Sequence, residues 1–400
     1  MDAFEVLQSR GFLKQCTHPE EVQQALNAGP VTFYVGFDPT ASSLHVGSLL
    51  QIMAMSWLQR AGHRVIALVG GGTSRVGDPS GKTELRKMMT DETIAEHSAG
   101  IRGQLSHFLD LNDPERGILV DNAEWLLQLQ YIPFLREVGR HFSVNRMLAA
   151  EAYKQRLERG LSFIEFNYQI LPAYDFLELN RRHGCRLQVG GDDQWGNIVA
   201  GVDLVRRMEQ TEVWGMTTPL LTTATGAKMG KTAAGAVWLD AARVQPFDYW
   251  QYWYNTHDDD VGRFLRLYTF LPEEKIARLE ALAGKEILEA KRVLANETTR
   301  LLHGEEAAQA AEAGAASMAA GAVSDGLPEH VLGADARLVA VIADAGLAKS
   351  KGEARRLVSQ GGVRIDNEKV EDPDQVVEPG PDGLILRVGK KRAARILASG

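Results

Sequence analysis

Residues 31–69 of this 400-residue chain read VTFYVGFDPTASSLHVGSLLQIMAMSWLQRAGHRVIALV. The apolar runs at 31–37 and 64–69 are typical of buried strands, and between them apolar residues recur at helical spacing as far as Gly62. A strand, a helix and a strand in so short a segment predict a βαβ unit with parallel strands and a right-handed crossover. The helix therefore begins at the carboxyl edge of the sheet, where doubly wound sheets bind their ligands.

Changes in pattern divide the rest of the chain. Further strands are predicted at 117–120 and 186–189, so residues 1–240 are expected to form an α/β domain with a Rossmann-like parallel sheet and a helical insertion at about 121–180. Residues 241–328 are expected to form an α-helical domain and a linker. The pattern at 247–302 is helical, and residues from about 304 to 328 are rich in Ala and Gly and poor in large apolar residues, as in a tether. Residues 334–400 are predicted to form a small α+β domain.

The composition is that of an ordinary globular protein. With 44% hydrophobic and 24% charged residues, bulk disorder, collagen and coiled coil are excluded. Cys16 and Cys185 are too few for a disulfide framework and lack the paired spacing of a structural zinc site, so a reducing cytoplasm is the expected location. The N-terminus does not resemble a signal peptide and no apolar run is long enough to span a bilayer, so no membrane partner is expected.

Three groups of polar residues could carry chemistry. At 34–48 a strand edge, a turn and a helix start follow one another, where the free N–H groups of a helix start and the small Gly47 suit a nucleotide, or His45 and Ser48 merely stand at the start of a helix. Lys228 and Lys231 stand among glycines, where they form either a mobile loop that closes over phosphates or a solvated surface turn. At 187–198 carboxylates and amides crowd a strand-to-helix turn, where they can bind ribose hydroxyls and an ammonium group or simply cap the helix.

Taken together, these groups resemble the signatures of class I aminoacyl-tRNA synthetases, and specifically of the bacterial tyrosyl-tRNA synthetases. His45-Val46-Gly47-Ser48 is similar to His-Ile-Gly-His, residues 228–232 are similar to Lys-Met-Ser-Lys-Ser, and residues 190–196 (GGDDQWG) resemble the motif of the tyrosine enzymes. The resemblance covers almost the whole chain. It implies a tyrosine-tRNA ligase that activates L-tyrosine with ATP to tyrosyl adenylate and transfers the tyrosyl group to the 3′ end of tRNA(Tyr), forming AMP and diphosphate.

The resemblance implies a pocket that distinguishes tyrosine from other amino acids. Tyr168 and Asp175, seven residues apart, are expected to share one face of a single helix over 167–175. By resemblance, Tyr34 and Asp175 hydrogen-bond the phenolic hydroxyl, while Tyr168 and Asp78 contact the ammonium group. Phenylalanine would leave a buried donor and acceptor unpaired, and tyrosyl-tRNA synthetases are themselves a known example of such rejection. The implied tyrosine-binding residues are Tyr34, Thr73, Asp78, Tyr168, Asp175 and Gln194.

The resemblance also assigns residues to ATP and to the chemical step. The tyrosine carboxylate is already ionised at neutral pH, so activation needs no protein nucleophile, and Mg²⁺ is expected to come with ATP without a metal site made by the protein. The implied ATP-binding residues are Gly36, Asp38, Thr40, His45, Gly47, Gly191, Asp193 and Lys231. The implied catalytic residues are His45, Ser48, Lys82, Arg86, Lys228, Lys231 and Thr232.

The glycine-rich run at 70–83 invites a P-loop interpretation, but its spacing excludes one. A P-loop needs four residues between its two glycines, whereas Gly77 and Gly81 enclose only three. By resemblance this run lines the amino acid pocket, and Lys82 and Arg86 lie on a loop that reaches the pyrophosphate. A charged surface helix is the alternative for these two residues.

The C-terminal tail, residues 334–400, resembles a small RNA-binding module shared with a ribosomal small-subunit protein. Residues 347–358 are similar to the helix pair of that module, and residues 361–367 are similar to its turn and strand. The tail carries 12 Lys and Arg residues against 10 Asp and Glu, although the whole chain has a net charge of −8. Contacts to tRNA phosphates are expected from Lys349, Lys351, Arg355 and Arg356, although a solvated helix face would use the same residue types. The resemblance further implies a homodimer that pairs through the insertion at about 121–180 and an anticodon contact at 247–302.

Pro172 is the main departure from the family pattern. It stands where tyrosine enzymes commonly have a glutamine that contacts the amino acid, and Gln169 is a candidate to replace that contact. The other departures are Ser48 for a histidine, Gly230 and Thr232 within the lysine signature, and Asp192 where serine is frequent.

Two other functions stay possible on the sequence. The sister tryptophan enzyme shares the fold and both signatures, but Tyr34 with Asp175 and the RNA-binding tail argue against it. A non-catalytic RNA-binding protein is favoured by Pro172 alone, whereas retention of His45 and the two signature lysines favours an enzyme. Exchange of pyrophosphate into ATP that depends on tyrosine would separate all three.

Overall fold

The computed structural model divides the chain into two compact units. The first contains residues 1–231, 238–240 and 263–271, and the second contains residues 232–237, 241–262 and 272–400. The structure describes residues 2–78, 89–149, 153, 154, 157, 160–226, 229–232, 235–320, 327–366, 368–381, 383–389 and 392–398.

A six-stranded sheet forms the centre of the first unit, with the strand order β1-β6-β5-β2-β3-β4. All neighbours are parallel except the edge pair β1 and β6, so the predicted parallel sheet is confirmed and gains one antiparallel strand. The strands are β1 (Gln15–Cys16), β2 (Thr32–Phe37), β3 (Arg64–Val69), β4 (Gly117–Asp121), β5 (Leu187–Gly191) and β6 (Trp214–Thr218).

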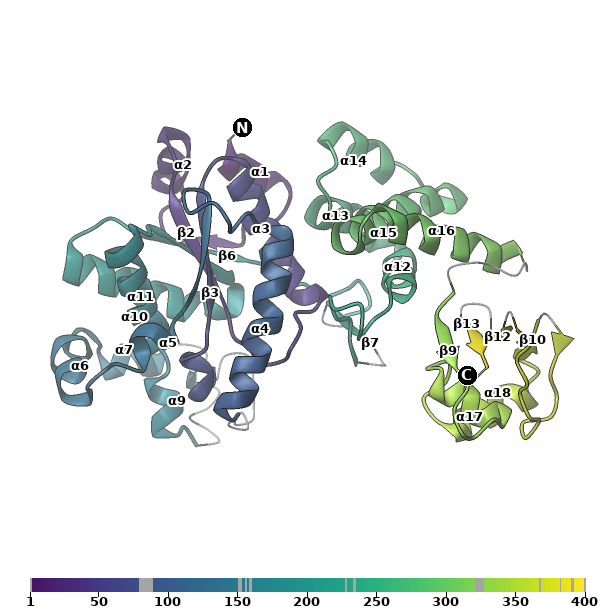
Figure 1. The fold of residues 1–400 in the computed structure, drawn as a ribbon. Coiled ribbons are helices and arrows are strands. Elements are labelled where there is room, and N and C mark those ends of the chain that lie inside the picture. The colour runs from purple at the N-terminus through teal and green to yellow at the C-terminus, as the bar shows by residue number, and fades with distance from the viewer. Residues whose placement is uncertain are drawn as a thin grey trace. The chain divides into compact units, whose positions relative to one another are not determined.

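Helices cover both faces of this sheet. Figure 1 shows α10 (Ile170–His183) and α11 (Trp195–Glu209) on one side and α3 (Val46–Arg60) and α4 (Asp91–Phe108) on the other. Strands β5 and β6 are therefore buried along their whole length, as expected of parallel strands between two helical layers. The remaining helices are α1 (Ala3–Ser9), α2 (Pro19–Ala28), α5 (Ala123–Leu126), α6 (Tyr131–Glu137), α7 (Val144–Ala149) and α9 (Phe163–Asn167), with short 3₁₀ turns η1 (Thr73–Arg75), η2 (Gly139–His141) and η3 (Asp192–Gln194).

The predicted single helix over 167–175 is wrong, because α9 ends at Asn167 and α10 begins at Ile170. Pro172 explains the break. It has no N–H to donate to the carbonyl of Tyr168, and its ring would clash with that carbonyl in a continuous helix. The amide of Leu171 instead donates to Tyr168 O at 2.9 Å, which makes a tight turn. Pro172 thereby lies in the first turn of α10, where a missing N–H costs nothing.

The second unit contains a helical part and a small sheet. The helices are α12 (Pro246–Tyr254), α14 (Glu273–Glu280), α15 (Ile287–His303) and α16 (Glu305–Ala320), with η4 (Gly284–Glu286), while α13 (Asp258–Tyr268) is divided between the units. A two-stranded ladder pairs β7 (Lys231–Thr232) with β8 (Gly235–Ala236). Residues 246–303 are therefore helical, as the pattern predicts.

The C-terminal residues form the predicted α+β fold. Five strands have the order β11-β10-β12-β13-β9, and Leu338, Ile342, Leu386 and Ile396 belong to their shared core with the helices. The elements are β9 (Glu329–Val331), α17 (Leu338–Asp344), α18 (Lys351–Ser359), β10 (Val363–Ile365), β11 (Glu368–Lys369), β12 (Leu384–Val388) and β13 (Arg392–Leu397). Among the helices of the described residues, none is both long and apolar enough to cross a membrane.

Candidate active site

Tyr34 and Asp175 lie together in the core of the first unit. Tyr34 extends from β2 and is 2% exposed, and Asp175 comes from α10 and is 1% exposed. The phenolic oxygen of Tyr34 has no hydrogen-bond partner among the residues that the structure describes. Burial raises the pKa of Tyr34 well above its usual value, and the nearby Asp175 carboxylate raises it further, so this hydroxyl stays protonated. The hydroxyl can therefore donate a hydrogen bond to an acceptor in the same buried site.

The Asp175 carboxylate is held by two fixed donors. Asn122 Nδ2 donates to Oδ2 at 2.9 Å, and Trp125 Nε1 donates to Oδ1 at 2.7 Å. Burial raises the pKa of Asp175 to about 7; the two hydrogen bonds oppose this shift, and the charges of Asp38 and Asp121 add to it. Each carboxylate oxygen has further lone pairs, so Asp175 can accept a hydrogen bond from a ligand hydroxyl.

The loop after β3 approaches these residues closely. Asn122 Oδ1 accepts from the backbone N–H groups of Gly72 at 2.7 Å and Thr73 at 3.4 Å, and Thr73 Oγ1 donates to Asp38 Oδ1 at 3.0 Å. A Cβ atom on Gly70 would lie 2.2 Å from Asp38 Oδ1, so only glycine allows this approach. The glycine run that suggested a P-loop therefore has a steric reason in the contact between this loop and Asp38.

Asn122 and Trp125 are not among the residues predicted from the sequence. A usable signal was present, because Asn122 directly follows β4, and polar residues at the carboxyl ends of parallel strands meet at one edge of the sheet. The register that pairs Val69 with Asp121 brings the loop after β3 beside the loop after β4.

A second polar group surrounds Asp78. Gln194 Nε2 donates to Asp78 Oδ2 at 2.9 Å, and Asn197 Nδ2 donates to Gln194 Oε1 at 2.8 Å, which fixes the Gln194 amide. Tyr168 is buried in the turn between α9 and α10. The structure thus brings Asp78 and Gln194 together, from segments 116 residues apart in sequence.

Gln169, the candidate replacement for the contact missing at Pro172, and Asp192, which stands where serine is frequent, make hydrogen bonds outside the group around Asp78. Gln169 Nε2 donates to the carbonyl of Gly196 at 3.0 Å, which uses one of the two N–H donors of this amide. Asp192 Oδ1 accepts from Gln15 Nε2 at 2.7 Å and from Thr217 Oγ1 at 2.8 Å. Its charge is therefore tied to the strand edge formed by β1 and β6.

The segment that contains the signature at 45–48 lies beside Met229 and Gly230 of the lysine signature. His45 caps α3, its Nδ1 accepts from Gly47 N at 3.0 Å, and Ser48 lies in the first turn. A Cβ atom on Gly47 would lie 3.2 Å from Met229 O, and one on Gly230 would lie 2.7 Å from Gly47 N, so glycines let the two segments touch.

The other sequence-predicted nucleotide residues lie at the same carboxyl edge or outside the description. Gly36 is in β2, Asp38 and Thr40 follow it, Gly191 ends β5, and the exposed Asp193 lies two positions further on. Lys82, Arg86 and Lys228 lie outside the described residues, and for Lys231 and Thr232 the structure describes the backbone as β7 but not the side chains. In the described ranges no group of three His, Cys, Asp or Glu side chains is placed to hold a metal ion.

The four predicted RNA-binding cations lie on exposed positions in and before α18. Two of them are paired: Lys351 Nζ contacts Asp335 at 2.8 Å, and Arg355 contacts both carboxylate oxygens of Asp374, at 2.9 and 2.6 Å. Pairs on an exposed surface are weak, so a phosphate can displace the carboxylates. Lys349 and Arg356 are the other two exposed residues of the group.

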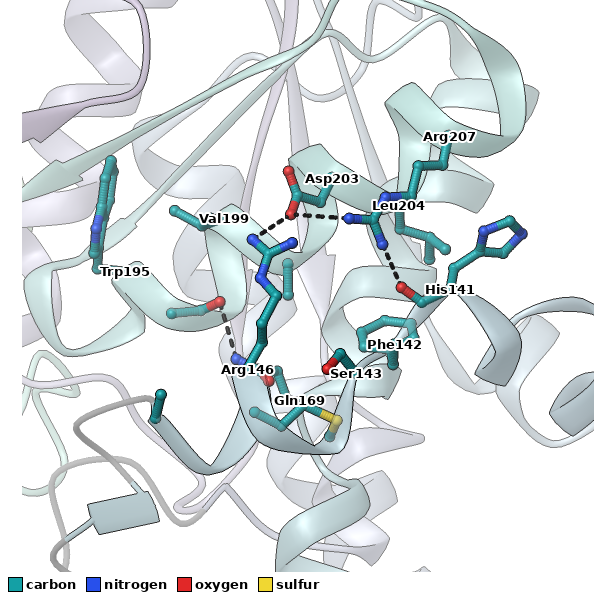
Figure 2. Close-up of a pocket in the computed structure, with 14 residues that line it drawn as sticks. His141, Phe142, Ser143, Arg146, Gln169, Trp195, Val199, Asp203, Leu204 and Arg207 are labelled. Atoms are coloured by element: carbon teal, nitrogen blue, oxygen red, sulfur yellow. Dashed lines mark hydrogen bonds and ion pairs between the residues drawn. The ribbon is translucent and has the colours of Figure 1, made fainter.

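A separate cavity, lined by residues not predicted from the sequence, lies between α7 and α11 (Figure 2). Arg146 NH2 donates to Asp203 Oδ2 at 2.8 Å, and Arg207 lies 3.8 Å from the same oxygen and also donates to the carbonyl of His141. Phe142, Val199 and Leu204 supply apolar surface to its wall.

Comparisons with known proteins identify the relatives of this chain. Residues 26–319 match the family described as tRNA synthetases class I (W and Y), and residues 336–381 match the S4 domain. A tyrosine–tRNA ligase of Rhodospirillum rubrum is 54% identical over 403 residues, which is 98% of this chain and 96% of that protein. One of Clostridium tetani is 50% identical over 403 residues, 99% of each. A C-terminally truncated mitochondrial tyrosyl-tRNA synthetase of Aspergillus nidulans, a solved structure, is 31% identical with a TM-score of 0.70, covering 78% of this chain and 92% of that one.

Proposed function

The chain belongs to the class I tRNA synthetases of the tryptophan and tyrosine group and catalyses the reaction of a tyrosine–tRNA ligase, and we propose that tyrosine binds between Tyr34 and Asp175. In the first step the tyrosine carboxylate attacks the α-phosphorus of ATP and pyrophosphate leaves. In the second step a hydroxyl of the terminal ribose of tRNA(Tyr) attacks the carbonyl carbon of tyrosyl adenylate and AMP leaves. Both steps depend on positioning and on stabilisation of charge on phosphate oxygens.

One observation carries the assignment of the substrate pocket: the hydroxyl of Tyr34, which has no partner within the described part of the chain, lies near a carboxylate whose two oxygens are already oriented by Asn122 and Trp125. A substrate phenol can donate to Asp175 and accept from Tyr34, which satisfies both buried groups at once. Phenylalanine offers neither a donor nor an acceptor and would bury both groups unpaired.

The opposite end of the substrate would contact Asp78, Tyr168, Thr73 and Gln194. The Asp78 carboxylate attracts the substrate ammonium group, and the chain from Asn197 through Gln194 holds that carboxylate in place. Pro172 supplies no hydrogen bond, so this end relies on fewer direct contacts than the family pattern provides.

ATP would lie at the N-terminal end of α3. The positive end of the α3 dipole suits an anion, and Gly47, whose N–H donates to His45 Nδ1, has no side chain to keep a flat ring from the backbone. The neighbouring Gly230 brings the lysine signature to the same place, so Lys228 and Lys231 would close on the phosphates together with Lys82 and Arg86. Gly36, Asp38, Thr40, Gly191 and Asp193 would complete the nucleotide site, and Mg²⁺ would enter with ATP through its phosphates.

Exposed apolar residues support a homodimer. Ile132 of α6 is 69% exposed and Phe163 of α9 is 71% exposed, and Tyr131, Leu135 and Ile164 are exposed as well. They are concentrated in the predicted insertion at about 121–180, and such a concentration is typical of an interface between copies. Sedimentation of the wild type and of the Ile132→Asp variant tests this: a wild-type mass of one chain, or a variant of unchanged mass, contradicts the proposal.

The tRNA would contact the C-terminal part through Lys349, Lys351, Arg355 and Arg356, and the reducing cytoplasm would be the location of the enzyme. Exchange of labelled pyrophosphate into ATP tests the substrate assignment. We expect exchange with tyrosine and little with tryptophan or phenylalanine. Exchange with tryptophan would indicate the sister specificity, and no exchange with any amino acid would indicate a non-catalytic RNA-binding protein.

A further inference from the structure

We propose that Asn122 is a positioning residue that couples recognition of the substrate hydroxyl by Asp175 to the placement of the 70–73 loop at the other end of the amino acid. The inference rests on the proposed binding of tyrosine between Tyr34 and Asp175. In this proposal Asn122 contacts neither tyrosine nor ATP. It acts through Asp175 and Thr73, which are assigned to the tyrosine site.

The Asn122 side chain makes four hydrogen bonds and is 1% exposed. Its nitrogen donates to Asp175 Oδ2 at 2.9 Å and to Thr73 Oγ1 at 3.1 Å, and its oxygen accepts from the N–H groups of Gly72 and Thr73. A primary amide has two N–H donors and two acceptor lone pairs, so its whole capacity is used.

This arrangement allows a single orientation of the amide. Turning the Asn122 side chain over would place its oxygen against the Asp175 carboxylate and its NH₂ group against two backbone N–H donors. A displacement of Asp175 is therefore transmitted to the loop, and a displacement of the loop is transmitted to Asp175.

The coupling continues to Asp38. The Thr73 hydroxyl accepts from Asn122, so its own hydrogen is free for Asp38 Oδ1, 3.0 Å away, or for the carbonyl of Gly70, 3.2 Å away. Asp175, Asn122, Thr73 and Asp38 thus form one chain of polar side chains from the phenol end of the pocket to the loop. Members of such a chain are expected to act non-additively.

Trp125 provides a matched control. It donates to the other oxygen of Asp175 at 2.7 Å, but it has no hydrogen bond to Thr73 or to the backbone of the loop. Trp125→Phe therefore weakens the support of Asp175 and leaves the link to the loop in place.

The test uses the ratio of kcat/KM for tyrosine to kcat/KM for phenylalanine in the pyrophosphate exchange reaction of the full chain. Thr73 lies at the end that both amino acids share, so the loss of a direct contact from Thr73 cancels in this ratio. We expect Thr73→Val, which keeps the shape and removes the hydroxyl, to lower the ratio by about 5-fold or more, and Thr73→Ser to restore it. An unchanged ratio in Thr73→Val overturns the coupling.

Double variants supply a second measurement. We expect Asn122→Ala to lower the ratio by about 10-fold to 100-fold, and the addition of Thr73→Val to lower it no further, because the chain is already broken. In Trp125→Phe, by contrast, the addition of Thr73→Val should multiply the losses. If the losses multiply in both pairs, Asn122 does not couple the two ends.

The outcomes separate this inference from the proposed site. Tyr34→Phe and Asp175→Asn should each lower the tyrosine-to-phenylalanine ratio. If neither does, the assignment of the substrate pocket fails; if both do while Thr73→Val has no effect, only the coupling through Asn122 fails. Thr73→Val leaves Asn122 in the core, so the test stands even if Asn122→Ala does not fold.

Discussion

Lowering the pH from about 7.5 to about 5.5 should lower kcat/KM for tyrosine by up to about 25-fold, and the preference for tyrosine over phenylalanine by at least the same factor. The cause is Asp175, whose pKa is raised to about 7, chiefly by burial. With that pKa the ionised fraction of the carboxyl falls from about three quarters to about 3% over this interval. Protonation of Asp175 places a hydrogen on an oxygen that already accepts from Asn122 or Trp125. It also removes the negative charge that strengthens the hydrogen bond from the substrate phenol.

The sign of the effect differs between the two amino acids. Phenylalanine brings an apolar ring against Asp175, and an uncharged carboxyl costs less to bury than a carboxylate. Its kcat/KM should therefore hold or rise as the pH falls, while that of tyrosine falls. Tyr34, Asp38 and Asp121 also act on Asp175; the pKa of Tyr34 is raised, so it stays protonated throughout, and the two carboxylates keep the pKa of Asp175 high.

The assay is pyrophosphate exchange with each amino acid across this pH range. kcat/KM reports the ionisation of the free enzyme, and effects on ATP or on the ammonium group cancel in the ratio. Asp175→Asn cannot ionise, so its ratio should be low and constant. A wild-type ratio that is flat, or that rises toward low pH, would refute the assignment of Asp175 as the group that recognises the phenol.

The other predictions concern the lysine signature and the core. Lys231→Ala should lower kcat of activation by about 100-fold or more with little change in tyrosine binding, and an unchanged rate in single-turnover kinetics would count against the role of the loop. Gly230→Ala should raise the KM for ATP or lower kcat by about 10-fold in total, because its Cβ would lie 2.7 Å from Gly47 N in addition to the strain at a φ of +77°. Gly226→Ala has a similar φ of +82° but no atom within 4 Å of its Cβ, so it carries the backbone strain alone and should lose less in the same assay. Arg10→Met should lower the free energy of unfolding by about 3 kcal/mol in urea titrations, because the buried Arg10 donates to the carbonyls of residues 266, 269 and 271. Arg60→Met is the control: Arg60 is exposed and stacks on Phe270, so its loss should cost less than about 1 kcal/mol.

Much of the fold could be predicted because the patterns that define it are local. Strand β2, helix α3 and strand β3 are written in the apolar periodicity and turn residues of one short segment, and right-handed crossover chirality then gives the parallel arrangement. The two signatures could be recognised for the same reason, since each is a run of neighbouring residues. The break between α9 and α10 was also a local property, because Pro172 removes a hydrogen bond to Tyr168, yet the spacing of Tyr168 and Asp175 suggested a continuous helix.

Asn122 and Trp125 show where local patterns stop. They lie 53 and 50 residues from the carboxylate that they hold, and no periodicity relates them to it. Their position depends on the register of β3 against β4 and on the packing of α10, which are long-range properties of the folded chain.

The amino-acid order alone was enough to establish the βαβ unit, the family resemblance and the residue types offered to tyrosine and ATP. Folding in three dimensions was needed to make Asp175 a buried carboxylate with a pKa of about 7, to leave the hydroxyl of Tyr34 without a partner in the described residues, and to bring Gly230 against Gly47. The reason is that burial, hydrogen-bond partners and steric contact arise between segments far apart in the chain, and their energies do not exist until those segments meet.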